Sequence, residues 1–317
     1  MTTTGPVRVC ADTWLITHLT PAPPLGKLFC NSAVIDGAQP LVIDTGCAGN
    51  RAAWLTQLTT LLDPTTVRWV FISHDDADHI GNLPALRARC PDATLLLSWL
   101  TLQRLTLRGE LGWPPDRIRV VDDGCVDIGD RVLCMVRPPV FDNPGTLGLV
   151  DQTTGFFWAA DCFAAPVAKF LIEADDTVDA HWRAGFLTAH RLLSPWHTLI
   201  DPRRYAPMID RLEQLPIAVA AGAHGPIVRG DRLTIAWRML RELPHLRPPE
   251  RFDPAAADYL NARMRPTVAR LEIAGAAARL APGRRKNRVD AEDRVGDPIG
   301  GTVTSEHTPE HDGEGPR

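Results

Sequence analysis

Alternating and continuous runs of apolar residues predict strands in the first part of the chain. Strands are expected at residues 13–17, 28–35 and 41–43, with a tight turn at Asp36-Gly37 between the last two. An amphipathic helix is expected over residues 51–62, because apolar side chains recur there at helical spacing. The chain therefore opens with a strand-rich block that leads into a helix.

Strands and helices alternate in the middle of the chain, and a second strand-rich block comes before a helical region. The expected elements are strands at residues 67–72, 94–97 and 118–121 with helices at 82–89 and 100–107, then strands at 131–136, 147–150, 156–159 and 217–220 with helices at 180–193, 202–215 and 232–243. Two strand-rich blocks, each followed by helices, predict an α/β (α+β) fold of four layers, αββα. The two sheets would pair face to face, with helices on both outer faces.

The end of the chain differs in composition from the rest. Residues 246–282 begin with a proline-rich linker and continue as an Ala- and Arg-rich helical extension, and residues 283–317 are rich in Gly, Pro and charge. The last segment holds too few apolar side chains for their burial to offset the entropy of ordering. We therefore expect a folded domain over residues 1–245, the linker and helical extension over 246–282, and a disordered tail over 283–317.

Composition and charge narrow the classes of partner. The 317 residues are 44% hydrophobic and carry a formal net charge of -4, so a sizeable core is expected and a basic face for nucleic acid is not. The apolar runs fall well short of the roughly 18 residues of a membrane span. The first residues show no basic and apolar regions of a secretory signal. These features favour a cytoplasmic protein with no nucleic-acid or membrane partner.

The cysteines give no pattern of a disulfide framework or a zinc-thiolate site, because their number is odd and no two are spaced as Cys-x-x-Cys. We expect them to be small buried side chains. The seven are Cys10, Cys30, Cys47, Cys90, Cys125, Cys134 and Cys162.

The most informative stretch follows the strand expected at residues 67–72. Four candidate metal ligands come within six residues: His74, Asp76, Asp78 and His79. Side chains can converge on a strand-to-helix loop without disturbing the sheet, and carboxylates and imidazoles are ordinary ligands of first-row divalent metals. His74 and Asp76 can face one metal site, and Asp78 and His79 a second. The alternative is a solvent-exposed acidic loop with no metal.

This stretch resembles the His-x-His-x-Asp-His signature of the metallo-β-lactamase superfamily, with Asp76 in place of the middle His. A carboxylate there is similar to the Glu of the flavodiiron proteins and of their oxygen-binding di-iron relatives. The segments Ala160-Asp161-Cys162-Phe163 and Gly222-Ala223-His224-Gly225-Pro226 resemble the segments that carry the family's bridging Asp and its last His. Ile43-Asp44-Thr45-Gly46 resembles the second-strand motif of the superfamily, which places Asp44 in a turn or beside a ligand.

One residue departs from the family. The segment Pro139-Val140-Phe141-Asp142-Asn143-Pro144-Gly145 resembles a stretch in which the family has His at the place of Asp142. Either Asp142 binds the metal through oxygen, or the first metal binds weakly or not at all. The resemblance implies a first site of His74, Asp76, Asp142 and Asp161, and a second of Asp78, His79, Asp161 and His224. This set is rich in oxygen, which favours iron or manganese over zinc for the two divalent ions. With the resemblance to di-iron proteins, iron is the favoured metal, and manganese and zinc are the alternatives.

The resemblance implies a non-haem di-iron centre that binds or reduces dioxygen or a related small oxidant. Residues after 245 lack the phosphate-loop pattern of a flavodoxin domain, so a separate protein is expected to donate electrons. One alternative is a hydrolase of a small ester, thioester or lactone, in which a metal-bridging hydroxide attacks and the catalytic residue Asp78 orients this hydroxide or takes its proton. A second is an oxygen or redox sensor without turnover. The sequence leaves open whether the protein is an enzyme, its substrate and its oligomeric state, a homo-oligomer included.

Overall fold

The structure, a computed structural model, describes residues 2–3, 5–22 and 25–249. The chain divides into two compact units, residues 1–263 and 264–317, and the described residues belong to the first. Most of the predicted helical extension, and all of the predicted tail over residues 283–317, lie outside the described residues. Among the helices that are described, none is long and apolar enough to cross a membrane.

The first sheet is antiparallel at one side and parallel at the other. Its hydrogen-bonded order is β1-β3-β4-β5-β6-β7-β8, with β2 paired to β3, and the pairs from β5 to β8 are parallel. Its strands are β1 (Thr2–Thr3), β2 (Val7–Cys10), β3 (Thr13–Pro21), β4 (Lys27–Ile35), β5 (Leu41–Ile43), β6 (Trp69–Phe71), β7 (Thr94–Leu97) and β8 (Ile118–Val120). Because neighbouring parallel strands end at the same edge of a sheet, the segments after β5 and β6 lie together.

The second sheet has one parallel pair, and this pair matters for the site. Its order is β14-β13-β12-β11-β10-β9, and only β12 and β13 run parallel. Its strands are β9 (Cys125–Asp127), β10 (Val132–Val136), β11 (Gly148–Asp151), β12 (Phe156–Trp158), β13 (Val219–Ala221) and β14 (Val228–Arg229). The chain leaves β12 just before Asp161 and leaves β13 just before His224, so these two residues reach the same edge.

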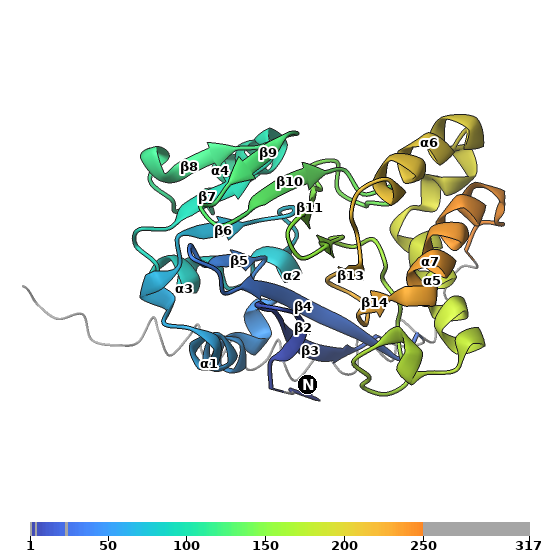
Figure 1. Cartoon of the computed structure of the whole chain (residues 1–317), viewed down its shortest axis with the longest axis horizontal. Coiled ribbons are helices and arrows are strands. Elements are labelled where there is room, and N and C mark those ends of the chain that lie inside the picture. The colour runs from blue at the N-terminus through green and yellow to red at the C-terminus, as the bar shows by residue number, and fades with distance from the viewer. Residues whose placement is uncertain (1, 4, 23–24, 250–317) are drawn as a thin grey trace, which may run out of the picture. The chain divides into compact units, whose positions relative to one another are not determined.

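Helices cover the outer face of each sheet (Figure 1). The α-helices are α1 (Arg51–Leu61), α2 (Ala77–Ile80), α3 (Leu83–Arg87), α4 (Trp99–Arg108), α5 (Asp179–Leu193), α6 (Pro202–Glu213) and α7 (Gly230–Glu242). The 3-10 helices are η1 (Ala48–Asn50), η2 (Pro64–Thr66), η3 (Pro115–Arg117), η4 (Ala174–Asp176), η5 (Pro195–Leu199) and η6 (Leu243–His245). The predicted four-layer αββα arrangement is confirmed.

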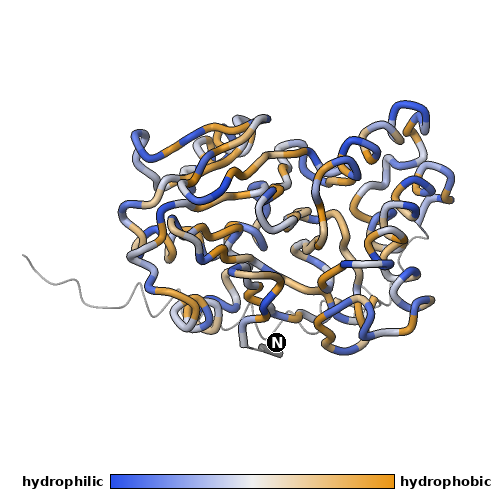
Figure 2. Tube along the Cα trace, in the orientation of Figure 1, coloured by the Kyte–Doolittle hydropathy of each residue, from blue (hydrophilic) through white to orange (hydrophobic). Residues whose placement is uncertain are grey.

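Three apolar clusters hold the layers together. One lies between the sheets, where Ile43 and Phe71 of the first meet Leu149 and Trp158 of the second. A second packs α1, α3 and α4 on the first sheet, and a third packs α5, α6 and α7 on the second. Figure 2 shows hydrophobic residues along the central strands and hydrophilic ones on the outer turns of the helices. Burial of both faces of the sheets stabilises the layering by about 25 cal/mol for each Å² of apolar surface.

The structure corrects the prediction for two cysteines. Cys125 and Cys134 form a disulfide, although no disulfide was expected from the number and spacing of the cysteines. The two residues lie directly opposite each other in the β9–β10 hairpin, so their side chains share one face of the sheet. The predicted elements missed β9, and with it the pairing that brings these thiols together. The prediction of buried thiols holds for Cys30, Cys90 and Cys162.

Candidate metal centre

The four clustered residues lie where the chain leaves β6. His74 and His79 are buried, and their side chains are 0% and 1% exposed. The side chains of Asp76 and Asp78 are 39% and 41% exposed, so they line the open side. The predicted loop contains a one-turn helix, α2, with Asp76 at its N-cap position and with Asp78 and His79 in its only turn. The sequence predicted a loop up to the helix expected at residues 82–89, whereas the structure begins a helical turn at Ala77.

All seven residues proposed from the sequence as metal ligands converge at this edge. They form three overlapping groups, and within each group the candidate ligand atoms lie within 4.8 Å of one another. The groups are His74, His79 and Asp161; Asp78, His79 and His224; and His74, Asp76 and Asp142. The two sheets contribute together, because five of the residues follow β6 or β10 and the other two follow β12 and β13.

Asp161 lies at the centre of these groups, with its two carboxylate oxygens facing different sides. Oδ2 is 3.4 Å from Nε2 of His74, whereas Oδ1 is 3.0 Å from Nε2 of His79 and 3.1 Å from Nε2 of His224. The residue itself is 1% exposed. A buried carboxylate with this division of its oxygens is suited to bridge two cations.

The three imidazoles are held by their other nitrogen. Nδ1 of His79 donates to Oδ2 of Asp44 at 2.9 Å, and Nδ1 of His224 donates to the carbonyl oxygen of Phe29 at 2.8 Å. Nδ1 of His74 lies 3.1 Å from the hydroxyl of Ser73. Each ring therefore directs Nε2 toward Asp161, the arrangement usual for histidines that bind a metal.

Buried polar atoms without partners test whether a metal fits here. Nε2 of His74, Nε2 of His79 and Oδ1 of Asp161 are buried and make no hydrogen bond, although Nε2 of His79 and Oδ1 of Asp161 lie only 3.0 Å apart. Leaving such groups unpaired costs about 1–3 kcal/mol each. A cation among them would satisfy all three atoms, so the donor set fits a metal.

The charges at the centre depend strongly on one another. Burial alone would raise the pKa of Asp161, but the imidazoles of His79, His74 and His224 outweigh it and hold this pKa well below its usual range. Burial would lower the pKa of His224, but the carboxylate of Asp161 outweighs it and raises this pKa to about 9. The imidazoles thus act as partial counterions for a carboxylate that is out of contact with water.

Asp142 lies at the exposed rim, in the group with His74 and Asp76. Partial burial of its carboxyl group and the negative charges of Asp161 and Asp76 together raise its pKa to about 7. The next residue, Asn143, donates from Nδ2 to Asp76 at 2.9 Å. Asn143 was not singled out from the sequence, and it fixes Asp76 against the segment that carries Asp142.

Strained backbone surrounds the centre. Among the described residues, three that are not glycine adopt a left-handed φ: Asp44 at 54°, Ala160 at 51° and Phe163 at 70°. Such a conformation costs on the order of 1–3 kcal/mol and persists only where the surroundings enforce it. Asp44 contacts a candidate ligand, and the other two flank Asp161. The strain is therefore concentrated in the segments that place the candidate ligands.

The comparison with known proteins agrees with this architecture. Residues 25–98 match the family model described as the Metallo-beta-lactamase superfamily. The flavodiiron protein from Giardia intestinalis superposes with a TM-score of 0.66 at 17% identity, over 77% of this chain and 60% of that chain. The chain has a metallo-β-lactamase fold. The rubredoxin oxygen:oxidoreductase from Desulfovibrio gigas superposes with a TM-score of 0.63 at 17% identity, over 77% of this chain and 62% of that chain.

A curated relative resembles the same region in sequence. The "Putative diflavin flavoprotein A 1" of Thermosynechococcus vestitus is 29% identical over 209 residues, which is 63% of this chain and 34% of the relative. The metallo-β-lactamase-fold chain thus spans about a third of the length of this relative. The metallo-β-lactamase fold and the similarity to flavodiiron proteins that the sequence motifs indicated are both confirmed.

Asp75, which lies between the candidate ligands His74 and Asp76 in the sequence, is buried. Its side chain is 0% exposed and accepts hydrogen bonds from Arg104 at 2.7 Å and from Arg108 at 2.5 Å. Burial would raise the pKa of Asp75, but these guanidinium groups and Asn143 lower it below its ordinary value. Arg104 and Arg108 are one turn apart on α4, so Asp75 attaches the segment of the candidate ligands to that helix. No local pattern around Asp75 indicates this contact.

Asp44 lies beside a candidate ligand, as the second-strand motif implied. Besides His79, it accepts hydrogen bonds from the backbone N–H of Ser73 at 2.8 Å, from the Ser73 hydroxyl at 2.7 Å and from Nε1 of Trp158 at 3.1 Å. It is 0% exposed. Ser73 and Trp158 were not foreseen, because they come from two different sheets and meet only in the folded chain.

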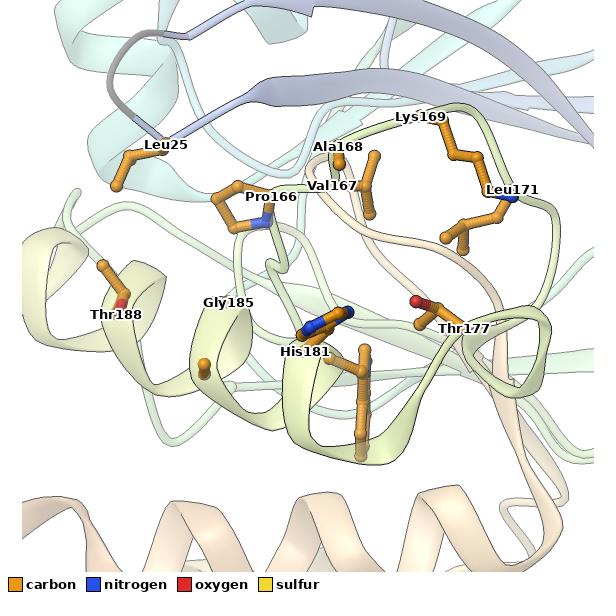
Figure 3. A pocket seen from close by; sticks show the side chains of 12 residues that line it. Leu25, Pro166, Val167, Ala168, Lys169, Leu171, Thr177, His181, Gly185 and Thr188 are labelled. Carbon is orange, nitrogen blue, oxygen red and sulfur yellow. The ribbon is translucent and has the colours of Figure 1, made fainter.

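Two cavities differ in their relation to the centre. An open one of about 460 Å³ is lined by Asp76, Asp78, Arg108 and neighbouring residues, so it leads to the exposed edge of the candidate ligands. A larger one of about 540 Å³ lies between α5 and the segment around Pro166, and it is lined by none of the seven (Figure 3). His181 lines this second cavity. Of these two cavities, only the smaller one borders candidate ligands.

Gly81 ends α2 where another segment passes very close. Its N–H donates to the carbonyl oxygen of Gly46 at 2.8 Å, and a Cβ at Gly81 would lie 2.6 Å from the carbonyl carbon of Cys47. Gly81→Ala should therefore destabilise the protein by about 1–3 kcal/mol, because the backbone must shift to make room. Urea unfolding measures this, with Gly5→Ala as the control, since a Cβ there meets nothing within 4 Å. If the two variants are equally stable, the segments around Gly81 and Cys47 can move apart without a loss of unfolding free energy.

Proposed function

We propose that the chain binds two metal ions on either side of Asp161. The division of the Asp161 oxygens between His74 on one side and His79 with His224 on the other is the observation that carries this proposal. The first ion would be held by His74, Asp76, Asp142 and Asp161, and the second by Asp78, His79, Asp161 and His224.

We propose iron as the metal. Four of the seven candidate ligands are carboxylates, and their charge would balance that of two divalent ions. A donor set rich in carboxylate suits iron or manganese better than the His-rich sets that bind zinc. The similarity to a flavodiiron protein supports iron between these two.

The proposed activity is the binding and reduction of dioxygen or a related small oxidant. Bound iron would supply open coordination positions and change oxidation state. The chain itself closes the floor of the site with the buried His74 and His79, which excludes bulk water. Asp76 and Asp78 form the half-exposed rim beside the open cavity, where a small molecule enters. The electrons would come from a separate donor protein, and a relative named rubredoxin oxygen:oxidoreductase supports this assignment.

Asp78 is proposed to move protons as well as to bind metal. Its Oδ2 lies 3.4 Å from Nε2 of His224, and its side chain is 41% exposed, so it joins the buried side of the site to solvent. A carboxylate in this position can take protons from water and release them to a reacting group within hydrogen-bond reach.

Oxygen consumption tests the activity. Protein purified without oxygen would be reduced chemically and mixed with dioxygen, and in parallel with nitric oxide. We expect consumption that stops when a chelator removes the metal. Iron-loaded protein that neither binds nor consumes either oxidant, but cleaves esters, thioesters or lactones when loaded with zinc, would show a hydrolase instead. Binding of dioxygen without turnover would identify a sensor.

The role of Asp142 is tested by two substitutions. Asp142→Ala should weaken one of the two metal sites by about tenfold or more and leave the site of Asp78, His79 and His224 intact, because only the first group loses a ligand. Asp142→His should retain two ions and shift the preference toward zinc, because nitrogen replaces a hard oxygen. Metal titration with each ion measures both effects. If Asp142→Ala binds both ions as tightly as the parent, another group or water completes the first site.

A further inference from the structure

Two thiols lie in contact beside the metal centre. Sγ of Cys30 is 3.3 Å from Sγ of Cys47, and it also lies 3.6 Å from the carbonyl oxygen of Asp78. Cys30 is a buried residue of β4, whereas Cys47 follows β5 and is half-buried. The two cysteines therefore join neighbouring strands of the first sheet at the edge where the candidate ligands gather.

The segment that carries Cys47 is bound to the helix that carries two candidate ligands. The backbone N–H of Thr45 donates to the carbonyl oxygen of His79 at 2.6 Å. Nδ2 of Asn82 donates to the carbonyl oxygen of Cys47 at 3.2 Å. These bonds, with the one from Gly81 to Gly46, attach the Cys47 segment to the C-terminal end of α2. A displacement of Cys47 would consequently move Asp78 and His79.

The residues on either side of Cys30 hold the remaining ligand. The carbonyl oxygen of Phe29 accepts the Nδ1 hydrogen bond of His224 at 2.8 Å. Nδ2 of Asn31 donates to the carbonyl oxygens of Gly222 at 2.8 Å and of Gly225 at 2.9 Å, which are the two ends of the turn that presents His224. The contact between the two thiols thus links the segment that places His224 to the segment that places Asp78 and His79.

We propose that Cys30 and Cys47 are a redox-active pair that is oxidised to a disulfide and thereby alters the second metal site. The half-buried Cys47 is the thiol that a peroxide can reach. Its sulfur attacks hydrogen peroxide to give a sulfenic acid and one water, and the sulfur of Cys30 then displaces a second water to form the S–S bond. The O–O bond of the peroxide breaks in the first step and the S–O bond of the sulfenic acid in the second. Both thiol protons leave in the two waters, and the two electrons that the thiols lose reduce the peroxide oxygens.

Bond formation requires the sulfurs to approach by about 1 Å, since a disulfide is roughly 2 Å long. That movement would draw the Cys47 segment, and α2 with it, toward β4. Formation of the disulfide depends on the contact of the thiols alone, whereas its effect on metal rests on the proposed function. The remaining free cysteines provide controls, because Cys90 and Cys162 are buried and Cys10 is, like Cys47, half-buried.

The test uses the full chain with and without iron. Protein treated with hydrogen peroxide is alkylated, digested and mapped by mass spectrometry, and its metal affinity is then titrated. We expect a Cys30–Cys47 disulfide in the parent and in Cys10→Ser, with none in Cys47→Ser or Cys30→Ala. We also expect oxidation to change the affinity of the second metal site by about tenfold. Disturbing the groups that hydrogen-bond to a metal ligand usually has an effect of about this size. Dithiothreitol should reverse both changes.

Three results would count against parts of this account, and they can be told apart. If both thiols remain open to alkylation after peroxide treatment of the folded parent, the redox pair is disproved. A disulfide that leaves the affinity for both ions unchanged in iron-binding protein disproves the link to the second site. A disulfide that forms in protein unable to bind metal in either state overturns the proposed function and leaves the redox pair supported.

Discussion

Asp161→Asn is expected to lose both metal ions. The substituted amide keeps the size of the side chain but carries no charge, and it replaces one of the two oxygens that face the two groups. Each site would lose its shared anionic ligand, and His74 on one side and His79 with His224 on the other would lose the carboxylate 3.0–3.4 Å from their Nε2 atoms. The affinity for metal should fall at least about a hundredfold. Losing one group that only positions a metal ligand already lowers the affinity by up to about that factor.

Metal analysis after extensive dialysis measures the loss, with Asp116→Asn as the control because Asp116 is exposed and lies on η3, away from the seven residues. Circular dichroism would establish that Asp161→Asn is folded. If the folded variant keeps two ions per chain, Asp161 does not bridge. If it keeps one, Asp161 belongs to a single site.

Arg131→Met is expected to destabilise the protein more than any surface substitution. The Arg131 side chain is 4% exposed and pairs with Asp12, Asp130 and Asp151, whose separations from it are 2.5, 2.7 and 3.0 Å. Asp12 lies between β2 and β3 of the first sheet, and Asp151 ends β11 of the second, so the guanidinium links the two sheets. Removing it leaves the fully buried Asp151 without its cation, which costs about 3–5 kcal/mol.

Urea unfolding of the metal-free protein gives this loss directly. The matched control is Arg203→Met, since the Arg203 side chain is 91% exposed and pairs with Asp201 at 3.3 Å. An exposed pair of this kind contributes about 0–1 kcal/mol. If the two variants unfold at the same urea concentration, Arg131 and its buried ion pairs make no net contribution to the free energy of unfolding.

The layers and the candidate ligands were predictable because their signals are local. Strands β5 and β6 are short apolar runs, and the second is followed by a stretch of six residues that contains His74, Asp76, Asp78 and His79. Neighbouring parallel strands end at the same edge of a sheet. The motifs that follow such strands can therefore be expected to lie close together.

What the sequence did not reveal depends on contacts between distant segments. The partner of Asp75 is an arginine pair on α4, and the partners of Asp44 include Trp158 from the other sheet. The contact of Cys30 with Cys47 results from the pairing of β4 with β5, which the alternation of residues does not by itself align. The short strands β2 and β14 carry too few residues to give a period, and the neighbouring sheets determine their conformation.

The metal content of protein purified without oxygen tests the central claim most directly. Iron analysis combined with Mössbauer spectroscopy counts the ions and shows whether they share a bridge. The account predicts two iron ions per chain in neighbouring, coupled positions. Protein that is folded and binds one ion only, or that takes up no metal when iron, manganese and zinc are each supplied, would contradict it.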